Sequence, residues 1–222
     1  MSRDGAAFVR ANTAVAAPPL VPEIRLHLAS EITPLWQATE ETLAQRQMPP
    51  PFWAFAWAGG QALARCLLDR PDLVAGRDAL DFGAGSGLVA IAAAKAGAHC
   101  VEAAETDPFA VAAIALNAAL NGVTIGVVAA DLLAGRAPPR RAVVLAGDVC
   151  YERPMAERTI ALLRRCAAQG SVVLLGDPGR AYLPRDGLVE VARYRVPVTR
   201  ELEDRDERDG VVYRVLAAAE PG

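Results

Sequence analysis

From residue 78 onward, short apolar runs alternate with longer Ala- and Leu-rich runs that have the spacing of helices. Short apolar runs of this kind are typical of buried strands, and their alternation with helices is typical of a parallel sheet covered on both faces. We therefore predict an α/β fold with seven strands, the last two forming a terminal β-hairpin. The predicted strands are 79–82, 100–105, 125–129, 143–146, 172–175, 189–198 and 211–216, and the predicted helices are 88–96, 108–121 and 155–168.

The first 60 residues have a different pattern. Three prolines mark the entry, Pro18, Pro19 and Pro22, and a helical stretch over 30–47 ends at the triple-proline turn 49–51. We expect an N-terminal helical lid or brace over 1–60, placed on a core over 61–222. A chain of 222 residues is best explained as one compact domain.

Composition narrows the class of protein. Every apolar run is interrupted well before the roughly 18 residues of a membrane helix, and the N-terminus lacks the apolar core of a signal peptide, so we expect a cytoplasmic protein without a membrane span. A net charge of -3 without a long basic block argues against nucleic-acid binding. The four cysteines form no CxxC pair and are expected to be reduced thiols of the core. His27 and His99 are isolated, so no metal site is predicted.

A glycine-rich turn follows the first core strand, in the order Asp81, Gly83, Gly85, Gly87. Such a turn lets a ligand approach bare backbone amides. Leu88 stands where a dinucleotide-binding loop has its third glycine, which argues against NAD. The order of an acidic residue and G-x-G-x-G resembles motif I of class I S-adenosylmethionine methyltransferases, whose Rossmann-like fold and cofactor the resemblance implies. The alternative is a turn that only packs strand against helix.

Two further carboxylates follow the next two strands. Glu105 lies 24 residues after Asp81, where a carboxylate can accept both hydroxyls of a ribose. We assign Glu105 to the ribose and Asp107 to the cap of the helix begun by Pro108, although the two roles could be exchanged. Asp131 stands where the same family places an acidic side chain on the adenine amino group; an ordinary loop aspartate is the alternative.

The fourth core strand is followed by Asp148-Val-Cys-Tyr151. Ligands of open α/β sheets bind beyond the carboxyl ends of the strands, so both side chains are expected to face the methyl donor. This D-x-x-Y resembles the motif of seven-strand lysine methyltransferases. Asp148 would then orient the acceptor nitrogen and stabilise its developing charge, and it would also contact the methyl donor. The ring of Tyr151 would form one side of the acceptor channel. Alternatively, Asp148 is a helix cap and Tyr151 a core residue.

Most of residues 8–180 resembles the bacterial electron transfer flavoprotein β-subunit lysine methyltransferases, through the runs 20–29, 34–40 and 49–65. The resemblance implies that Trp57, Gly60 and Gln61 line the donor pocket, and that the acceptor is a lysine of a folded partner, the flavoprotein β subunit. By the alternative interpretation, Trp53, Phe55 and Trp57 are an aromatic cluster of the core.

Other functions stay open at this point. A small-molecule, nicotinamide-like N-methyltransferase would use the same donor site, whereas an oxidoreductase or a non-catalytic binding module fits the motifs less well. The absence of a proline platform after Asp148 disfavours a nucleic-acid methyltransferase. The loop 200–210 has six acids against three arginines and is expected to be a solvated hairpin tip, or else a docking surface for a basic patch. A monomer is favoured.

Overall fold

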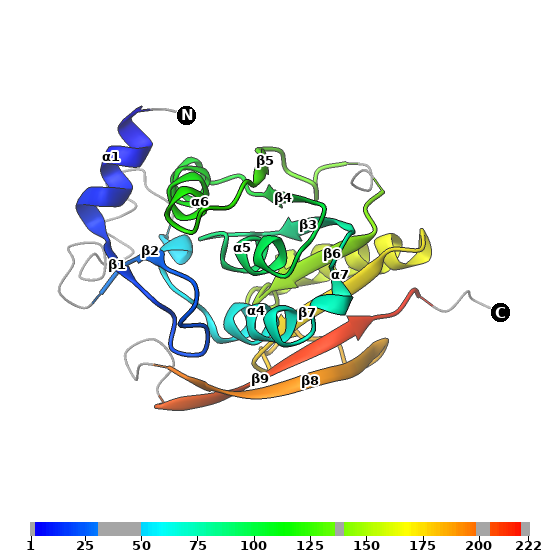
Figure 1. The fold of residues 1–222 in the computed structure, drawn as a ribbon. Helices are drawn as coiled ribbons and strands as arrows, with labels where there is room; N and C mark the ends of the chain where they lie inside the picture. Colours follow the sequence, from blue (N-terminus) through cyan, green and yellow to red (C-terminus); the bar gives the residue numbers. More distant parts are fainter. Residues whose placement is uncertain (1–2, 31–49, 136–139, 199–204, 219–222) are drawn as a thin grey trace.

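A seven-stranded sheet forms the centre of the protein, in the order β5-β4-β3-β6-β7-β9-β8 (Figure 1). The structure is a computed structural model, and it describes residues 3–30, 50–135, 140–198 and 205–218. Strands β3 to β7 run parallel, and β9 lies antiparallel to both β7 and β8. The strands are β3 (Asp78–Phe82), β4 (Cys100–Ala104), β5 (Gly126–Val128), β6 (Val143–Gly147), β7 (Val172–Asp177), β8 (Leu188–Pro197) and β9 (Glu207–Val215).

Helices cover both faces of this sheet, as the sequence predicts. In β6, Val143 and Leu145 belong to the hydrophobic cluster of one face, whereas Val144 and Ala146 belong to that of the other. The first cluster includes buried residues of α4 (Ala58–Asp69) and α5 (Leu88–Lys95), and the second those of α7 (Arg153–Ala168). Side chains alternate between the two faces of a strand, so a continuous apolar strand is buried on both sides.

The predicted elements of the core are confirmed, most of them to within two residues. Two differences have physical causes. β9 begins at Glu207 rather than 211, because its charged first residues also pair with β8, in a ladder that starts at Pro197–Glu207. An ion pair between the Arg195 and Glu207 side chains, 2.9 Å between N and O, lies across this part of the ladder. Helix α4, which contains two glycines in its first turn, is absent from the prediction.

The N-terminal segment packs beside α6 (Pro108–Leu120). It contains α1 (Arg3–Asn12), the two-stranded pair β1 (Ala14–Ala16) and β2 (Leu26–Leu28), and the short helical turn η1 (Phe52–Ala54); a second turn, η2 (Pro71–Leu73), follows α4. The Phe8 and Phe109 rings lie 4.4 Å apart between α1 and α6. The predicted helix over 30–47 lies outside the described residues apart from Ser30, and α4 crosses the expected boundary between residues 60 and 61.

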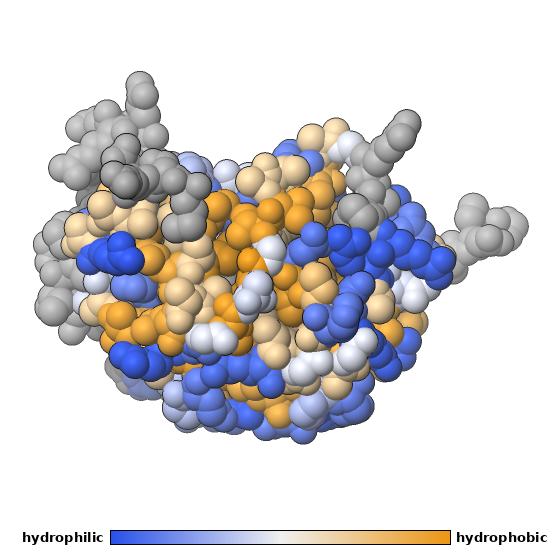
Figure 2. Space-filling model, turned by 45° about the horizontal axis from the view of Figure 1, so that its top comes forward, coloured by the Kyte–Doolittle hydropathy of each residue, from blue (hydrophilic) through white to orange (hydrophobic). Residues whose placement is uncertain are grey.

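Figure 2 shows apolar side chains gathered over the middle of one face and bordered by hydrophilic ones. The helices of the described ranges are all too short or too polar to cross a membrane. All four cysteines are free, and Cys66, Cys150 and Cys166 are buried as expected, whereas the core position is wrong for Cys100, which is exposed at the start of β4. The cytoplasmic location stays a prediction.

Candidate active site

A cavity of about 540 Å³ opens where the carboxyl ends of β3, β4 and β6 meet. From β3 the chain crosses to β4 on one side, whereas β6 lies on the other side, so this is the point where the strand order reverses. Residues from η1, the start of α4, the loop after β5 and the loop after β7 complete the wall. The lining residues are Pro50, Phe52, Trp53, Trp57, Phe82, Gly83, Gly85, Ala104, Glu105, Thr106, Asp107, Ala110, Ala130, Asp131, Leu132, Leu133, Gly147, Asp148, Val149, Tyr151, Met155 and Arg180.

The glycine turn after β3 has the backbone conformation that glycine favours. Gly83, Gly85 and Gly87 have φ angles of 64°, 52° and 80°. Gly83 and Gly85 line the cavity, whereas Gly87 caps the N-terminus of α5 against the side chain of Ile114. An L side chain at any of the three would be strained, so the turn exposes backbone rather than side chains to the cavity.

Asp81 lies in β3 just before this turn and contacts α5. Its side chain is buried, and its Oδ2 accepts a hydrogen bond from the Ala90 N–H at 2.9 Å. Burial raises the pKa of Asp81 to about 8. Asp81 does not line the cavity, and its hydrogen bond joins β3 to the first turn of α5. Its assignment to the cofactor stays a prediction.

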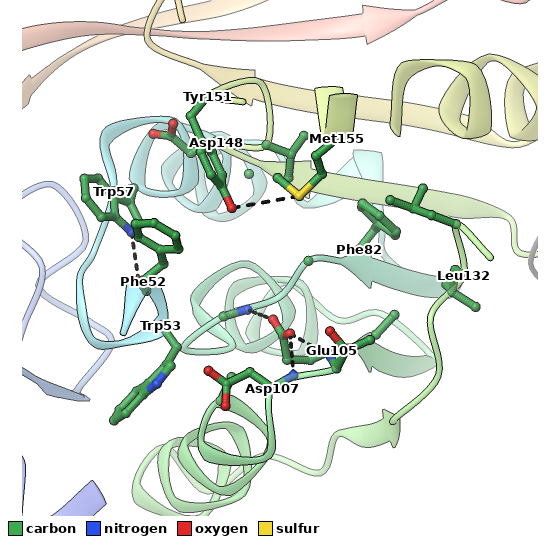
Figure 3. A pocket seen from close by; sticks show the side chains of 18 of the residues that line it. Phe52, Trp53, Trp57, Phe82, Glu105, Asp107, Leu132, Asp148, Tyr151 and Met155 are labelled. Carbon is green, nitrogen blue, oxygen red and sulfur yellow. Dashed lines mark hydrogen bonds between the residues drawn. The ribbon is translucent and has the colours of Figure 1, made fainter. Parts of the chain in front are cut away.

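Glu105 joins the end of β4 to the glycine turn. Its Oε2 accepts a hydrogen bond from the Gly85 N–H at 3.0 Å, and its Oε1 accepts those of Thr106 and Asp107 at 2.7 and 3.1 Å. The predicted helix cap is confirmed, since Asp107 Oδ1 accepts the Phe109 N–H at 2.7 Å at the start of α6. Both carboxylates still line the cavity, on the side opposite Tyr151 (Figure 3).

Asp131 follows β5 and lines the cavity together with Leu132 and Leu133. Its Oδ1 accepts the N–H of Leu133 at 2.8 Å, which fixes the local turn. Phe82 lies nearby at the end of β3 (Figure 3). This part of the wall therefore presents apolar surface with one carboxylate at its edge.

Asp148 follows β6 in a strained backbone conformation, with a φ of 60°. Its N–H donates to the Gly176 carbonyl at 2.8 Å, and its Oδ2 accepts the Gly59 N–H at 2.8 Å. Its Oδ1 lies 2.6 Å from Nε of Arg180, and only 3% of its side chain is exposed. The carboxylate thus lies at the cavity as expected, but it is covered by Arg180, which the sequence analysis does not single out.

Aromatic side chains form the mouth of the cavity beside Asp148. The Phe52 ring lies 5.3 Å from that of Tyr151 and 6.2 Å from that of Trp57. The Trp57 indole donates to the Phe52 carbonyl at 2.8 Å, and the Tyr151 hydroxyl lies 3.9 Å from the sulfur of Met155 (Figure 3). Phe52 and Tyr151 are 47% and 41% exposed, so aromatic surface faces solvent beside the cavity.

Two of the residues predicted in the N-terminal run lie elsewhere. Gln61 is buried outside the cavity lining, where its Oε1 accepts the Leu20 N–H at 3.2 Å and its Nε2 donates to the Ala56 carbonyl at 2.6 Å. Gly60 does not line the cavity either. Trp57 lines it, and the buried Trp53 does too, so the aromatic cluster is both core and cavity wall.

Sequence reasoning misses Arg180, Phe52 and Met155. Arg180 ends a turn that directly follows β7, in the order Asp177-Pro-Gly-Arg180. A charged residue at the carboxyl end of a parallel strand is the signal that could have found it.

Comparison with known proteins identifies the family. The model of the ribosomal protein L11 methyltransferase (PrmA) family matches residues 62–147. The electron transfer flavoprotein beta subunit lysine methyltransferase of Danio rerio is 35% identical over 213 residues, which cover 93% of this chain and 81% of that protein. The Xenopus laevis protein of the same name is 39% identical over 175 residues, covering 78% and 70% of the two chains. The chain belongs to the electron transfer flavoprotein beta subunit lysine methyltransferase family.

Solved structures agree with this membership at the level of the fold. A ribosomal protein L11 methylase from Lactobacillus delbrueckii superposes with a TM-score of 0.50 at 23% identity, over 73% of this chain and 81% of that chain. Magnesium protoporphyrin IX methyltransferase from Synechocystis, solved with S-adenosylmethionine, gives 0.52 at 18% identity, over 72% and 80%. The predicted class I methyltransferase fold, enzyme class and S-adenosylmethionine cofactor are confirmed.

Proposed function

We propose that this methyltransferase transfers the methyl group of S-adenosylmethionine to a lysine side chain of a folded protein, and that this protein is the electron transfer flavoprotein β subunit. The observation that carries the proposal is that one cavity brings together the residues assigned to the methyl donor and those assigned to the acceptor. The glycine turn and Glu105 lie on one side, and Asp148 and Tyr151 lie on the other, beside an open aromatic mouth. The named relatives supply the identity of the partner.

The described residues fit the cofactor by charge and by shape. S-adenosylmethionine carries a sulfonium, an ammonium and a carboxylate, and four acidic side chains line the cavity: Glu105, Asp107, Asp131 and Asp148. We assign one ribose hydroxyl to Glu105, whose other acceptor positions hold three backbone N–H groups, and the amino-acid end to the glycine turn, where glycine backbone leaves room. The adenine would lie against Phe82, Leu132 and Leu133, with its amino group toward Asp131.

When bound, the cofactor supplies an electrophilic methyl group on its sulfonium. The acceptor lysine enters as an ammonium and loses a proton to solvent before transfer, because its lone pair must form the new bond. That lone pair forms the N–C bond as the bond to sulfur breaks, which leaves a neutral thioether and a methylated ammonium. Asp148 stabilises the positive charge that develops on nitrogen, and the Tyr151 ring, with Phe52, guides the side chain toward the methyl group.

The test uses purified protein with tritiated S-adenosylmethionine and two acceptors in separate reactions, the flavoprotein β subunit and nicotinamide. We expect label in the β subunit, which tandem mass spectrometry should assign to a lysine. Asp148→Asn removes the charge that stabilises the developing ammonium, so it should lower transfer by a factor of about 100. The amide oxygen still accepts the Gly59 N–H, so cofactor affinity should change little.

Glu157→Gln, on the outer side of α7, is the matched control and should transfer at the normal rate. Label found only in nicotinamide would support a small-molecule N-methyltransferase instead. Absence of label from both acceptors would contradict the proposal.

A further inference from the structure

The carboxylate assigned to the acceptor amine lines the cavity but is already paired with a side chain of the protein itself. Arg180 Nε lies 2.6 Å from Asp148 Oδ1, and the exposed fractions of the two side chains are 16% and 3%. Asp148 Oδ2 meanwhile accepts the Gly59 N–H. An acceptor nitrogen therefore reaches this carboxylate only if the guanidinium of Arg180 moves.

The surroundings of the guanidinium form a binding site for a cation. Its central carbon lies 5.7 Å from the centroid of the Trp57 ring, on the face where a positive charge is attracted. Asp148 provides the opposite charge, and the Phe52 and Tyr151 rings continue the aromatic wall toward the mouth. A carboxylate beside an aromatic face suits an ammonium as well as it suits a guanidinium.

The backbone at Arg180 is held independently of its side chain. Asp177, which is buried at the end of β7, accepts the N–H groups of Gly179 and Arg180 at 2.7 Å each through Oδ1. Gly179 has a φ of 83°, which completes the turn. The backbone hydrogen bonds of this turn therefore do not depend on where the Arg180 side chain lies.

We propose that Arg180 determines acceptor specificity by occupying the place of the acceptor ammonium on Asp148, so that only a cationic side chain replaces it. The inference rests on the proposed function and deepens it. A lysine ammonium exchanges one cation for another at Asp148 and keeps the buried carboxylate paired. A neutral ring such as nicotinamide leaves the Arg180–Asp148 pair intact and gains no contact with the carboxylate.

The experiment measures binding without transfer, using n-butylammonium as a probe for the lysine side chain. Calorimetry in the presence of S-adenosylhomocysteine compares the wild type, Arg180→Met and the double variant Arg180→Met with Asp148→Asn. Methionine keeps an apolar contact with Trp57 and removes the charge. We expect Arg180→Met to bind n-butylammonium at least tenfold more tightly than the wild type, the double variant to lose this gain, and nicotinamide to show none.

Equal affinity of the wild type and Arg180→Met for n-butylammonium, or an equal gain for nicotinamide, would overturn the proposal. Thermal unfolding verifies that each variant is folded, and Arg180→Gln replaces Arg180→Met if the latter is not. Because no methyl group is transferred in this assay, its outcome is separate from the labelling test of the proposed function. If the wild type labels no acceptor, the proposed function is overturned, whereas the role of Arg180 is still decided by the binding measurement.

Discussion

At the scale of single residues, Glu105 connects cofactor binding to the shape of the glycine turn. Its two carboxylate oxygens accept three backbone N–H groups, those of Gly85, Thr106 and Asp107. A carboxylate offers about four acceptor positions, so one remains for a ligand hydroxyl. The side chain therefore acts twice, by holding the turn and by facing the cavity.

Glu105→Gln should weaken cofactor binding by a factor of ten or more. The amide replaces one accepting oxygen with a donor, which would face a backbone N–H and lose a charge-assisted hydrogen bond worth about 1.5–3 kcal/mol. Calorimetric titration with S-adenosylhomocysteine measures the change. Glu102→Gln, in the β4 strand that precedes Glu105, is the control, because Glu102 pairs with Arg141 and does not line the cavity. Equal affinities for the wild type and Glu105→Gln would contradict the assignment.

Residues of this site can be predicted from the sequence where they belong to a local pattern. A residue whose interaction partner lies on a distant strand cannot. The glycine turn, Glu105 and the cap by Asp107 are features of adjacent residues, so they can be recognised from spacing. Arg180 lies 32 residues after Asp148, and only the neighbouring positions of β6 and β7 in the sheet bring the two together. For the same reason, sequence alone gives no sign that Gln61 binds the Leu20 backbone.

At the scale of elements, α4 depends on glycine because its backbone touches the sheet. A Cβ added at Gly59 would lie 2.4 Å from the Gly176 carbonyl oxygen in β7, and one added at Gly176 would lie 2.2 Å from the Gly59 oxygen. This contact places the Gly59 N–H on Asp148. Glycine lowers helix propensity, which explains why the sequence pattern does not predict α4. Tertiary packing nevertheless requires glycine at this position.

Gly59→Ala should destabilise the protein by about 3 kcal/mol, because the new methyl group meets backbone atoms that cannot move aside without shifting α4 or β7. Gly60→Ala is a matched control in the next position, where an added Cβ meets no atom within 4 Å. It should change stability by less than about 1 kcal/mol. Chemical denaturation measures both. Similar losses for the two variants would show that the close contact between α4 and β7 is not what requires glycine.

At the scale of the whole molecule, one buried side chain joins the N-terminal segment to the glycine turn. Asn117 of α6 is fully buried; its Oδ1 accepts the His27 N–H of β2 at 2.8 Å, and its Nδ2 donates to the Ser86 carbonyl at 2.8 Å. Val9 of α1 shares a hydrophobic cluster with the cavity residues Trp53 and Ala110. These contacts support the interpretation of the first 60 residues as a brace, which stays a proposal.

Asn117→Ala should therefore uncouple β2 from the cofactor site as well as destabilise the fold. It removes the partners of the Ser86 carbonyl, which is buried, and of the His27 N–H, which is partly buried, at a cost of about 3 kcal/mol. Asn121→Ala is the control, since its hydrogen bonds to the Arg25 N–H and carbonyl, at 3.0 and 2.6 Å, are exposed, and a third, to the Asn117 carbonyl at 2.8 Å, lies at the end of α6 and is only partly buried. Each should cost less than about 1 kcal/mol. Hydrogen exchange with and without S-adenosylhomocysteine measures the coupling. The ligand should slow exchange of the Leu26–Leu28 amides in the wild type and in Asn121→Ala, but not in Asn117→Ala. Protection of β2 that persists in Asn117→Ala would mean that the N-terminal segment responds to the cofactor by another route, or through the packing of α1 on α6 alone.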